Sequence, residues 1–366
     1  MNTRTSHLTP RPGIMGISPY VGGRSAVAGR QNVIRLASNE SALGPSPRAV
    51  TAYEAVGNSL HRYPDGGAND LRAALGELHG LDAARIVCGS GSDEILQLLA
   101  KAYAGPGDEV LYSRHGFLVY GLAARAVSAE PVAAPETDFR ADVDALLAHV
   151  TEKTRILFLA NPNNPTGSYL TEGELRRLWG GLPENILLVI DSAYAEYVTV
   201  EDYEAGADLV DRAKNVVMTR TFSKIYGLAA LRLGWCYGAE EVIDVMNRMR
   251  GPFNVTAPAL AAGLAAVADQ DHIATARRHN DKWLKRLDAE LTPTGITALP
   301  SVCNFLLLRF PEGGSHDSKA ADAFLTARGI LARNVDNYHL PECLRVSIGR
   351  DDEMDALLSA LKEFMA

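Results

Sequence analysis

The sequence predicts an α/β fold, in which a large domain has a mostly parallel, mixed sheet between helices and a smaller domain is α+β. Three observations lead to this expectation. Short apolar runs are bounded by turn residues, helical patterns lie between many of them, and the texture changes after residue 250. Continuous apolar runs are typical of strands buried on both faces, and strands that alternate with helices favour parallel pairing with right-handed crossovers.

Six short segments are the predicted strands of the large sheet. They are RIVCG (85–89), EVLYS (109–113), RILFLA (155–160), ILLVID (186–191), VVMTRTF (216–222) and LGWCYG (233–238). Helices are expected in DEILQLLAKAYA, after the first strand, and in TEGELRRLWGGL, before the fourth. This alternation is the pattern of an open sheet covered by helices.

After residue 250 we expect one long helical region over residues 252–291. Strands at 304–310 and 344–349, a helix around AADAFLTARG and a final amphipathic helix then follow. The resulting division is an N-terminal arm, a large domain and a small domain that packs with the arm. Their predicted ranges are 1–35, 36–255 and 256–366.

Composition excludes several classes of partner. The formal charge is -8, so neither a nucleic acid nor an anionic membrane is an expected partner. The four cysteines are far apart in the sequence and form no C-x-x-C pair, so we expect no zinc or other metal site and no disulfide framework. The N-terminus has no apolar signal region and no run is long enough for a membrane span, which predicts a cytoplasmic protein.

The stretch TFSKIYGLAALRLGW (221–235) has one lysine, Lys224, and an arginine, Arg232, among Ala, Leu and Gly. A surface helix would surround these cations with polar residues, so both are expected to face a site. A lysine in an apolar pocket has a lowered pKa and becomes a nucleophile toward carbonyls. The alternative is a lysine at a helix edge. A serine-hydrolase S-x-x-K motif is excluded because Thr221 stands where serine is needed.

Three further stretches could contribute to the same site. CGSGSDEIL (88–96) has a glycine turn before a helix, which suits an anion, although Ser92 or Asp93 could simply cap that helix. Glu94 rules out a dinucleotide fingerprint there.

NPNNPTG (161–167) follows a strand and offers amide groups, or is an ordinary surface loop. In VIDSAYAEY (189–197), Asp191 ends an apolar strand and Tyr194 follows, so this carboxylate either meets a buried cation or caps the strand. Together the four stretches supply what pyridoxal 5′-phosphate needs: a lysine, an acidic partner for the pyridine nitrogen and a phosphate site.

With these residues in place, the sequence resembles the histidinol-phosphate aminotransferase family, a group of fold-type I pyridoxal-phosphate enzymes. The matching pieces lie in family order over nearly the whole chain. They are LASNESALGPSP (36–47), RYPDGGANDLRAAL (62–75), GSGSDE (89–94), HGFLVY (115–120), NPNNPTG, DSAYAEY, TFSKIYGLAALRLGW and LRVSIG (344–349).

The resemblance implies roles for residues around the cofactor. Lys224 would bind the cofactor's aldehyde covalently and later move a proton, and Asp191 would pair with the protonated pyridine nitrogen. Asn164 and Tyr194 would form hydrogen bonds with the phenolic oxygen of the ring.

The resemblance also implies how the rest of the cofactor is held. Ser92 and Asp93, through backbone N–H groups, would bind the phosphate with Ser223 and Arg232, and Phe117 would stack on the ring. Arg232 would thus balance the phosphate charge beside the lysine.

The family is homodimeric, so the resemblance implies a homodimer in which Tyr63 reaches the cofactor phosphate of the neighbouring subunit. Arg345 would bind the α-carboxylate of glutamate as a bidentate fork. Arg333 and Tyr20 match positions that contact the phosphate of histidinol phosphate.

The implied activity is ping-pong transamination between glutamate with 2-oxoglutarate and histidinol phosphate with imidazole-acetol phosphate, in histidine biosynthesis. Two local departures from the family pattern, at 39–44 and 332–342, leave the amino donor open. The alternatives are an aromatic amino-acid aminotransferase of the same group and a same-fold decarboxylase of a phosphorylated amino acid. A non-catalytic sensor of the same fold would need a DNA-binding domain, for which the arm is too short and too rich in Gly and Pro.

Overall fold

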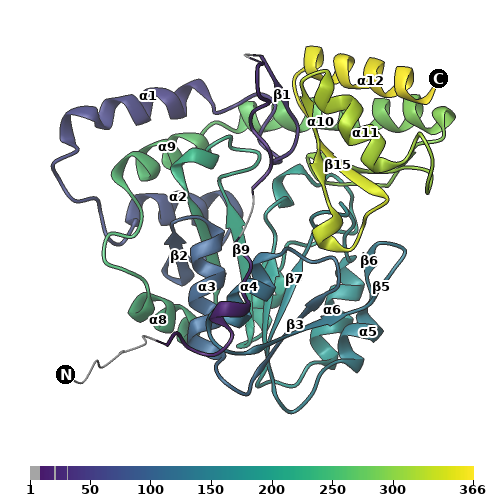
Figure 1. Ribbon diagram of the computed structural model, residues 1–366. Helices are drawn as coiled ribbons and strands as arrows, with labels where there is room; N and C mark the ends of the chain where they lie inside the picture. Colours follow the sequence, from purple (N-terminus) through teal and green to yellow (C-terminus); the bar gives the residue numbers. More distant parts are fainter. Residues whose placement is uncertain (1–8, 20–21, 31) are drawn as a thin grey trace, which may run out of the picture.

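The computed structural model describes residues 9–19, 22–30 and 32–366. Its two larger sheets are surrounded by helices (Figure 1). The large sheet has seven strands in the order β2-β10-β9-β8-β7-β3-β4, and only β10 runs antiparallel to its neighbours. Its strands are β2 (Ile86–Gly89), β3 (Glu109–Ser113), β4 (Glu130–Ala134), β7 (Thr154–Ala160), β8 (Leu187–Asp191), β9 (Val216–Thr221) and β10 (Gly234–Gly238).

All six predicted strands are therefore present, and β4 is an additional one. Its sequence, EPVAA, begins with Glu and Pro, and its first four residues are not fully buried. Because β4 is at the edge of the sheet, it lacks the continuous apolar run that marks the central strands.

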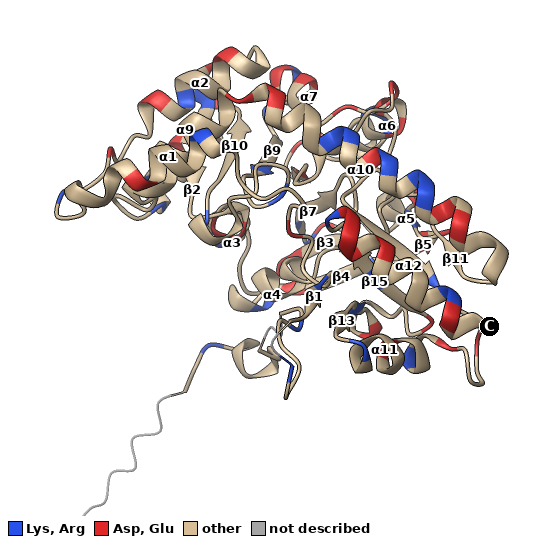
Figure 2. Cartoon of the chain, turned by 90° about the horizontal axis from the view of Figure 1, so that it is seen from above, with Lys and Arg blue, Asp and Glu red and all other residues tan. Residues whose placement is uncertain are grey.

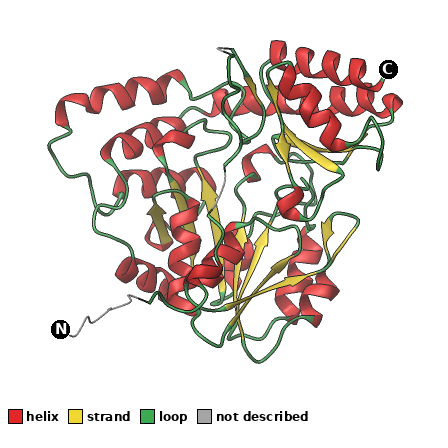
Figure 3. Cartoon of the chain, viewed as in Figure 1, coloured by secondary structure: helices red, strands yellow, loops and turns green. Residues whose placement is uncertain are grey.

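Helices cover both faces of the large sheet, as expected (Figure 3). One face packs on α3 (Ser92–Tyr103), α4 (Val119–Ala126) and α8 (Glu240–Met249). The other packs on α2 (Asn69–His79), α5 (Val143–Ala148), α6 (Glu172–Gly181), α7 (Ala207–Arg212) and α9 (Ala257–Val267). Helix α1 (Pro47–Ala55) lies against α9.

The single helical region predicted over residues 252–291 is wrong. The chain forms two helices there, α9 (Ala257–Val267) and α10 (Gln270–Leu291), with Thr256 capping the first. The break falls at Asp269, whose carboxylate accepts a hydrogen bond of 2.7 Å from the hydroxyl of Ser46, the N-cap of α1. This tertiary contact ends the helical run, because Asp competes with the helix for backbone and side-chain partners.

The small sheet is antiparallel, in the order β11-β12-β15-β14, and packs on α10, α11 (Ser318–Ala327) and α12 (Asp351–Met365). Its strands are β11 (Thr297–Ala298), β12 (Phe305–Arg309), β14 (Arg333–Asn334) and β15 (Cys343–Ser347). Two pairs of two-residue strands complete the list: β1 (Ile34–Arg35) with β13 (Ile330–Leu331), and β5 (Glu136–Thr137) with β6 (Arg140–Ala141). Basic and acidic residues are mixed along α10, whereas the start of α12 is acidic (Figure 2).

The N-terminal segment contacts both parts of the molecule. β1 pairs with β13, and the side chain of Arg24 binds Asp322 of α11. Nearer the N-terminus, Arg11 donates a hydrogen bond of 2.6 Å to the carbonyl of Ala126 in α4. The predicted division into arm, large domain and small domain stays a prediction. Helix α9 begins at Ala257, just after the predicted boundary between residues 255 and 256, and it packs on α1 and α2, which belong to the predicted large domain.

The register of the central parallel strands determines where polar side chains can gather. Ala160 of β7 is paired with Asp191 of β8, and Asp191 is paired with Thr219 of β9, two residues before that strand ends. The carboxyl ends of these strands thus meet at one edge of the sheet, the usual place for ligands in open α/β sheets. Among the described helices, none has the length and apolar character needed to cross a membrane.

Candidate active site

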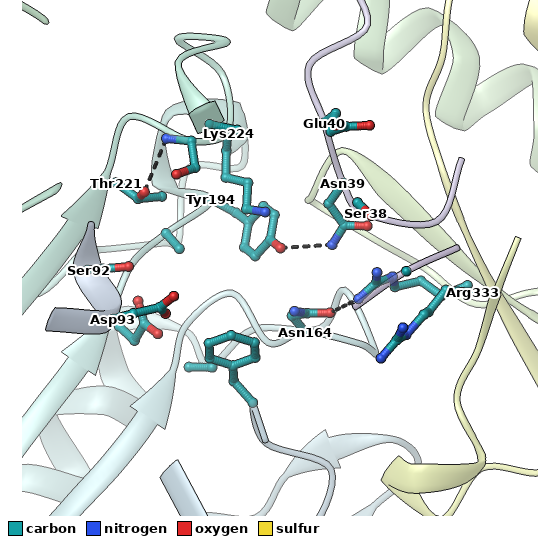
Figure 4. Close-up of a pocket in the computed structure, with 18 of the residues that line it drawn as sticks. Ser38, Asn39, Glu40, Ser92, Asp93, Asn164, Tyr194, Thr221, Lys224 and Arg333 are labelled. Carbon is teal, nitrogen blue, oxygen red and sulfur yellow. Dashed lines mark hydrogen bonds between the residues drawn. The ribbon is translucent and has the colours of Figure 1, made fainter. Parts of the chain in front are cut away.

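A pocket of about 330 Å³ opens at this edge, between the large sheet and the small one (Figure 4). Ser92 and Asp93 lie at one end and Arg333 at the other, with Lys224 and Tyr194 between them. Eleven of the thirteen predicted site residues line the pocket: Ser92, Asp93, Phe117, Asn164, Asp191, Tyr194, Ser223, Lys224, Arg232, Arg333 and Arg345.

Lys224 follows the end of β9 and lies partly buried in the pocket, with its Nζ 5.6 Å from the centroid of the Tyr194 ring. Burial lowers the pKa of this lysine to about 8, and the nearby cations Arg345 and Arg232 act in the same direction. A lysine with such a pKa is neutral in a substantial fraction of molecules near neutral pH. It is therefore able to attack a carbonyl carbon.

Asp191 is the last residue of β8 and is almost fully buried. Its Oδ2 accepts a hydrogen bond of 2.9 Å from the Tyr120 hydroxyl, and its Oδ1 accepts one of 3.1 Å from Thr219. Burial raises the pKa of this carboxyl to about 6. In the described chain no basic side chain lies within ion-pair distance of Asp191, so a cationic N–H group entering the pocket would find a suitable partner.

The start of α3 forms a cradle for an anion. Gly91 has φ +82°, where other residues are strained, and a Cβ at this position would lie 2.5 Å from the guanidinium of Arg232 and would displace it. Arg232 donates to the Ser223 hydroxyl at 3.1 Å and faces the carboxylate of Asp93 at 3.5 Å. The alternative in which Ser92 or Asp93 caps the helix is not observed, because the N-cap is Gly91 and has no side-chain bond. The free first-turn N–H groups and the helix dipole favour an anion here.

Two arginines lie at the opposite end of the pocket. Arg345 of β15 and Arg333 of β14 are direct partners across the antiparallel pair. The buried guanidinium of Arg345 donates to the side-chain oxygen of Asn164, and also to the carbonyl of Ala37 at 2.8 Å. These bonds hold the Arg345 side chain in one orientation, as recognition by a planar fork requires.

Two predicted site residues are not in this pocket. Tyr63 is 82% exposed and its ring stacks on Phe253 with centroids 4.7 Å apart. A residue on the surface is available to a second copy of the chain, which is the role implied for it. Tyr20 lies outside the described residues.

Among the residues not predicted from the sequence, Asn39 and Tyr338 line the pocket, and Tyr120 and Thr219 form hydrogen bonds with Asp191. Asn39 lines the pocket with φ +55° and donates a hydrogen bond of 2.8 Å to the Tyr194 hydroxyl oxygen. Tyr120 and Thr219 orient the Asp191 carboxylate through their hydrogen bonds to it. Tyr338 lines the pocket together with Arg333 and Arg345. The signal that could have found Thr219 is a hydroxyl residue within the apolar run of β9.

Comparison with known proteins gives the class of the chain. Residues 31–361 match the family model described as aminotransferase class I and II. The crystal structure of histidinol-phosphate aminotransferase from Sinorhizobium meliloti, in complex with pyridoxal-5′-phosphate, superimposes with a TM-score of 0.85 at 30% identity, covering 92% of both chains. The fold is thus that of the fold-type I pyridoxal-phosphate aminotransferases, and the chain is an aminotransferase.

The most similar relatives narrow the class. The chain is 57% identical over 356 residues to histidinol-phosphate aminotransferase of Paramagnetospirillum magneticum, which covers 97% of this chain and 98% of that protein. It is 56% identical over 357 residues to the enzyme of the same name from Rhodospirillum rubrum, covering 98% and 97%. The chain belongs to the histidinol-phosphate aminotransferase family.

The residues present fit pyridoxal 5′-phosphate, the cofactor of this class. Lys224 is a partly buried amine with a lowered pKa, and Asp191 is a buried carboxylate without a cation of its own. Ser92, Ser223 and Arg232 surround a cradle in which a glycine leaves room for a phosphate. Among the described residues no group of three or more His, Cys, Asp or Glu could hold a metal ion.

Proposed function

We propose that this enzyme transfers the amino group of L-histidinol phosphate to 2-oxoglutarate, giving imidazole-acetol phosphate and L-glutamate, in the cytoplasm and in histidine biosynthesis. The observation that carries the proposal is the adjacent pair Arg345 and Arg333 in the same pocket as Lys224. Two neighbouring guanidiniums suit an enzyme that binds a carboxylate in one half-reaction and a phosphate in the other. The names of the relatives at 56% and 57% identity support the same substrate.

Cofactor binding follows from the residues at the other end. Lys224 Nζ would form the covalent link to the cofactor, while Ser92, Ser223, Arg232 and the backbone N–H groups at the start of α3 would hold its phosphate. When bound, the cofactor supplies an electron sink that stabilises negative charge at the substrate Cα.

Proton movement is the task of this chain's own side chains. Lys224 Nζ would take the proton that leaves the substrate Cα and deliver it to the carbon that was the cofactor's aldehyde carbon, because a pKa of about 8 allows both protonation states near neutral pH. Asp191, oriented by Tyr120 and Thr219, would keep the pyridine nitrogen protonated. Tyr194, oriented by Asn39, and Asn164 would form hydrogen bonds with the phenolic oxygen, and Phe117 would stack on the ring.

Substrate anions enter at the arginine end. Arg345, held by Asn164 and the carbonyl of Ala37, receives the α-carboxylate of glutamate. Arg333 and Tyr20 receive the phosphate of histidinol phosphate. The enzyme is a homodimer in which Tyr63 of each subunit reaches the cofactor phosphate of the other.

Lys224→Ala tests the proposed chemistry. The variant retains the pocket but loses the nucleophile and the proton carrier, so formation of glutamate from histidinol phosphate and 2-oxoglutarate should fall by roughly four orders of magnitude or more. The assay follows glutamate release by wild type and variant at saturating substrate. A variant that turned over at a rate near wild type would refute the role of Lys224, and a wild type inactive with histidinol phosphate would refute the proposed substrate.

A further inference from the structure

His115 forms a hydrogen bond between a segment that follows the large sheet and a segment that follows β14 of the small sheet. It follows β3 of the large sheet, and its ring Nδ1 lies 2.6 Å from the backbone carbonyl oxygen of Tyr338, in the short helical turn η7 (Asp336–Tyr338) after β14. Phe117, two residues after His115, and Tyr338 both line the active-site pocket. The bond therefore joins the segment proposed to stack on the cofactor to the segment beside the substrate arginines.

The His115 backbone is fixed to the large domain on both sides. Its N–H donates to Oε1 of Glu136 at 3.0 Å, and its carbonyl accepts from the side-chain amide of Asn163 at 3.3 Å. The ring stacks on Phe139, with centroids 6.5 Å apart. Because a carbonyl oxygen can only accept, Nδ1 must carry the proton of this bond, which defines the ring as a donor.

The acceptor end belongs to the substrate half of the pocket. Tyr338 is 3% exposed, and its N–H donates to the carbonyl of Val335 at 2.8 Å, which closes the turn directly after β14. Arg333 lies in β14, five residues before Tyr338, and lines the same pocket. A displacement of this turn would therefore shift Tyr338 and change the space beside the arginine.

We infer that His115 is a positioning residue, which holds the 333–338 segment at the distance from Phe117 that the amino donor requires. It acts through the Tyr338 carbonyl and does not touch the reacting atoms. This inference rests on the proposed function, because it assigns the 333–338 segment to the amino donor. The expected consequence of losing the bond is weaker donor binding with little change in the chemical step.

The test uses His115→Phe, which keeps a ring against Phe139 but removes the donor. We expect KM for histidinol phosphate to rise roughly five- to tenfold, as for the loss of one hydrogen bond, while kcat stays within about twofold. His115→Gln, which restores a side-chain N–H donor, should recover part of the affinity. The matched control is His149→Phe, because His149 Nδ1 makes a similar bond of 2.7 Å to the carbonyl of Ala145, at the end of α5.

A second readout does not depend on activity. In cofactor-free protein, amide hydrogen exchange at residues 336–339 should be faster in His115→Phe than in wild type, and unchanged in His149→Phe. Unchanged KM and exchange in His115→Phe would overturn the inference, as would equal losses in both variants. If wild type does not use histidinol phosphate at all, the proposed function fails instead, and the exchange comparison still tests the role of His115.

Discussion

At the scale of single residues, Lys224 and Asp191 are opposite charges whose pKa values are displaced toward each other by burial. The pKa of Lys224 falls to about 8 and that of Asp191 rises to about 6 in the cofactor-free protein. Near neutral pH, Asp191 is therefore mostly ionised in a place that disfavours its charge. The buried negative charge lowers the stability of the cofactor-free protein, and a cationic ring nitrogen bound beside it would compensate for this charge.

Asp191→Asn should raise the stability of the cofactor-free protein near neutral pH and lower its activity. Because the folded-state pKa is raised, protonation of Asp191 stabilises the fold below about pH 4, and this contribution is lost as pH rises through 6. The ionised carboxylate then destabilises the cofactor-free protein by about 3 kcal/mol. We expect the variant to have a higher Tm than wild type near pH 7.5 and to lose that advantage toward pH 4, whereas its turnover falls roughly a hundredfold.

Thermal unfolding of the cofactor-free proteins between about pH 4 and 8 measures this difference. Asp288→Asn, on the exposed face of α10, is the control and should show no comparable pH-dependent gain. A lower Tm for Asp191→Asn at every pH would contradict the account, because it would mean that the hydrogen bonds from Tyr120 and Thr219 outweigh the burial of charge.

At the scale of elements, the start of α3 depends on two glycines, one in the turn before the helix and one in β10. Gly91 precedes the helix, and Gly234 lies in β10, where a Cβ would be 2.4 Å from the backbone nitrogen of Ser92. Because Gly91 has no side chain, the Arg232 guanidinium can approach the start of α3, and because Gly234 has none, β10 can approach the backbone nitrogen of Ser92. The cradle is therefore made by the close packing of β10 against the first turn of α3, with Arg232 beside it.

Gly91→Ala should weaken cofactor binding without unfolding the protein. The new Cβ would be 2.5 Å from Arg232 and strained at φ +82°, so the arginine must move away from the phosphate site. We expect the Kd for pyridoxal phosphate to rise roughly tenfold or more. Gly180→Ala in α6 has nothing within 4 Å of its Cβ and is the control. Equal Kd values for the two variants would show that the cradle does not need this glycine.

Site residues marked by a local sequence pattern could be predicted, whereas those that depend on contacts between distant segments could not. Lys224 and Asp191 were predicted from local patterns: Asp191 ends an apolar strand, and Lys224 is the one lysine in a segment of mostly Ala, Leu and Gly. Tyr120 and Asn39 were not, because their hydrogen bonds join residues 71 and 155 positions apart and depend on tertiary packing. The break between α9 and α10 was missed for the same reason, since Ser46 is distant in sequence from Asp269.

At the scale of the whole molecule, exposed aromatic and aliphatic side chains gather near α1 and the loop that follows. Tyr53 is 47% exposed, Leu60 68% and Tyr63 82%, and Phe253 stacks on Tyr63. Exposed apolar side chains grouped in this way mark a surface for association. They support the proposal that a second copy covers this region and takes Tyr63 into its own site.

Mixing two inactive or weakened variants tests that proposal. Tyr63→Phe should bind pyridoxal phosphate more weakly, and Lys224→Ala should be inactive. A mixed dimer then has one site with intact Lys224 that receives intact Tyr63 from its neighbour. We expect mixing to restore wild-type cofactor affinity and turnover at that one site, measured after exchange of subunits. Activity that merely falls in proportion to the added Lys224→Ala protein would contradict a shared site.

A single half-reaction tests whether the enzyme is a transaminase whose amino donor carries a phosphate. Purified enzyme loaded with pyridoxal phosphate receives histidinol phosphate or, separately, phenylalanine or tyrosine, while the absorbance of the bound cofactor is followed. We expect rapid bleaching at low histidinol phosphate and a slow, weak response to the aromatic amino acids. A stronger response to phenylalanine or tyrosine would contradict it and would make Arg345 the main anchor for both substrates.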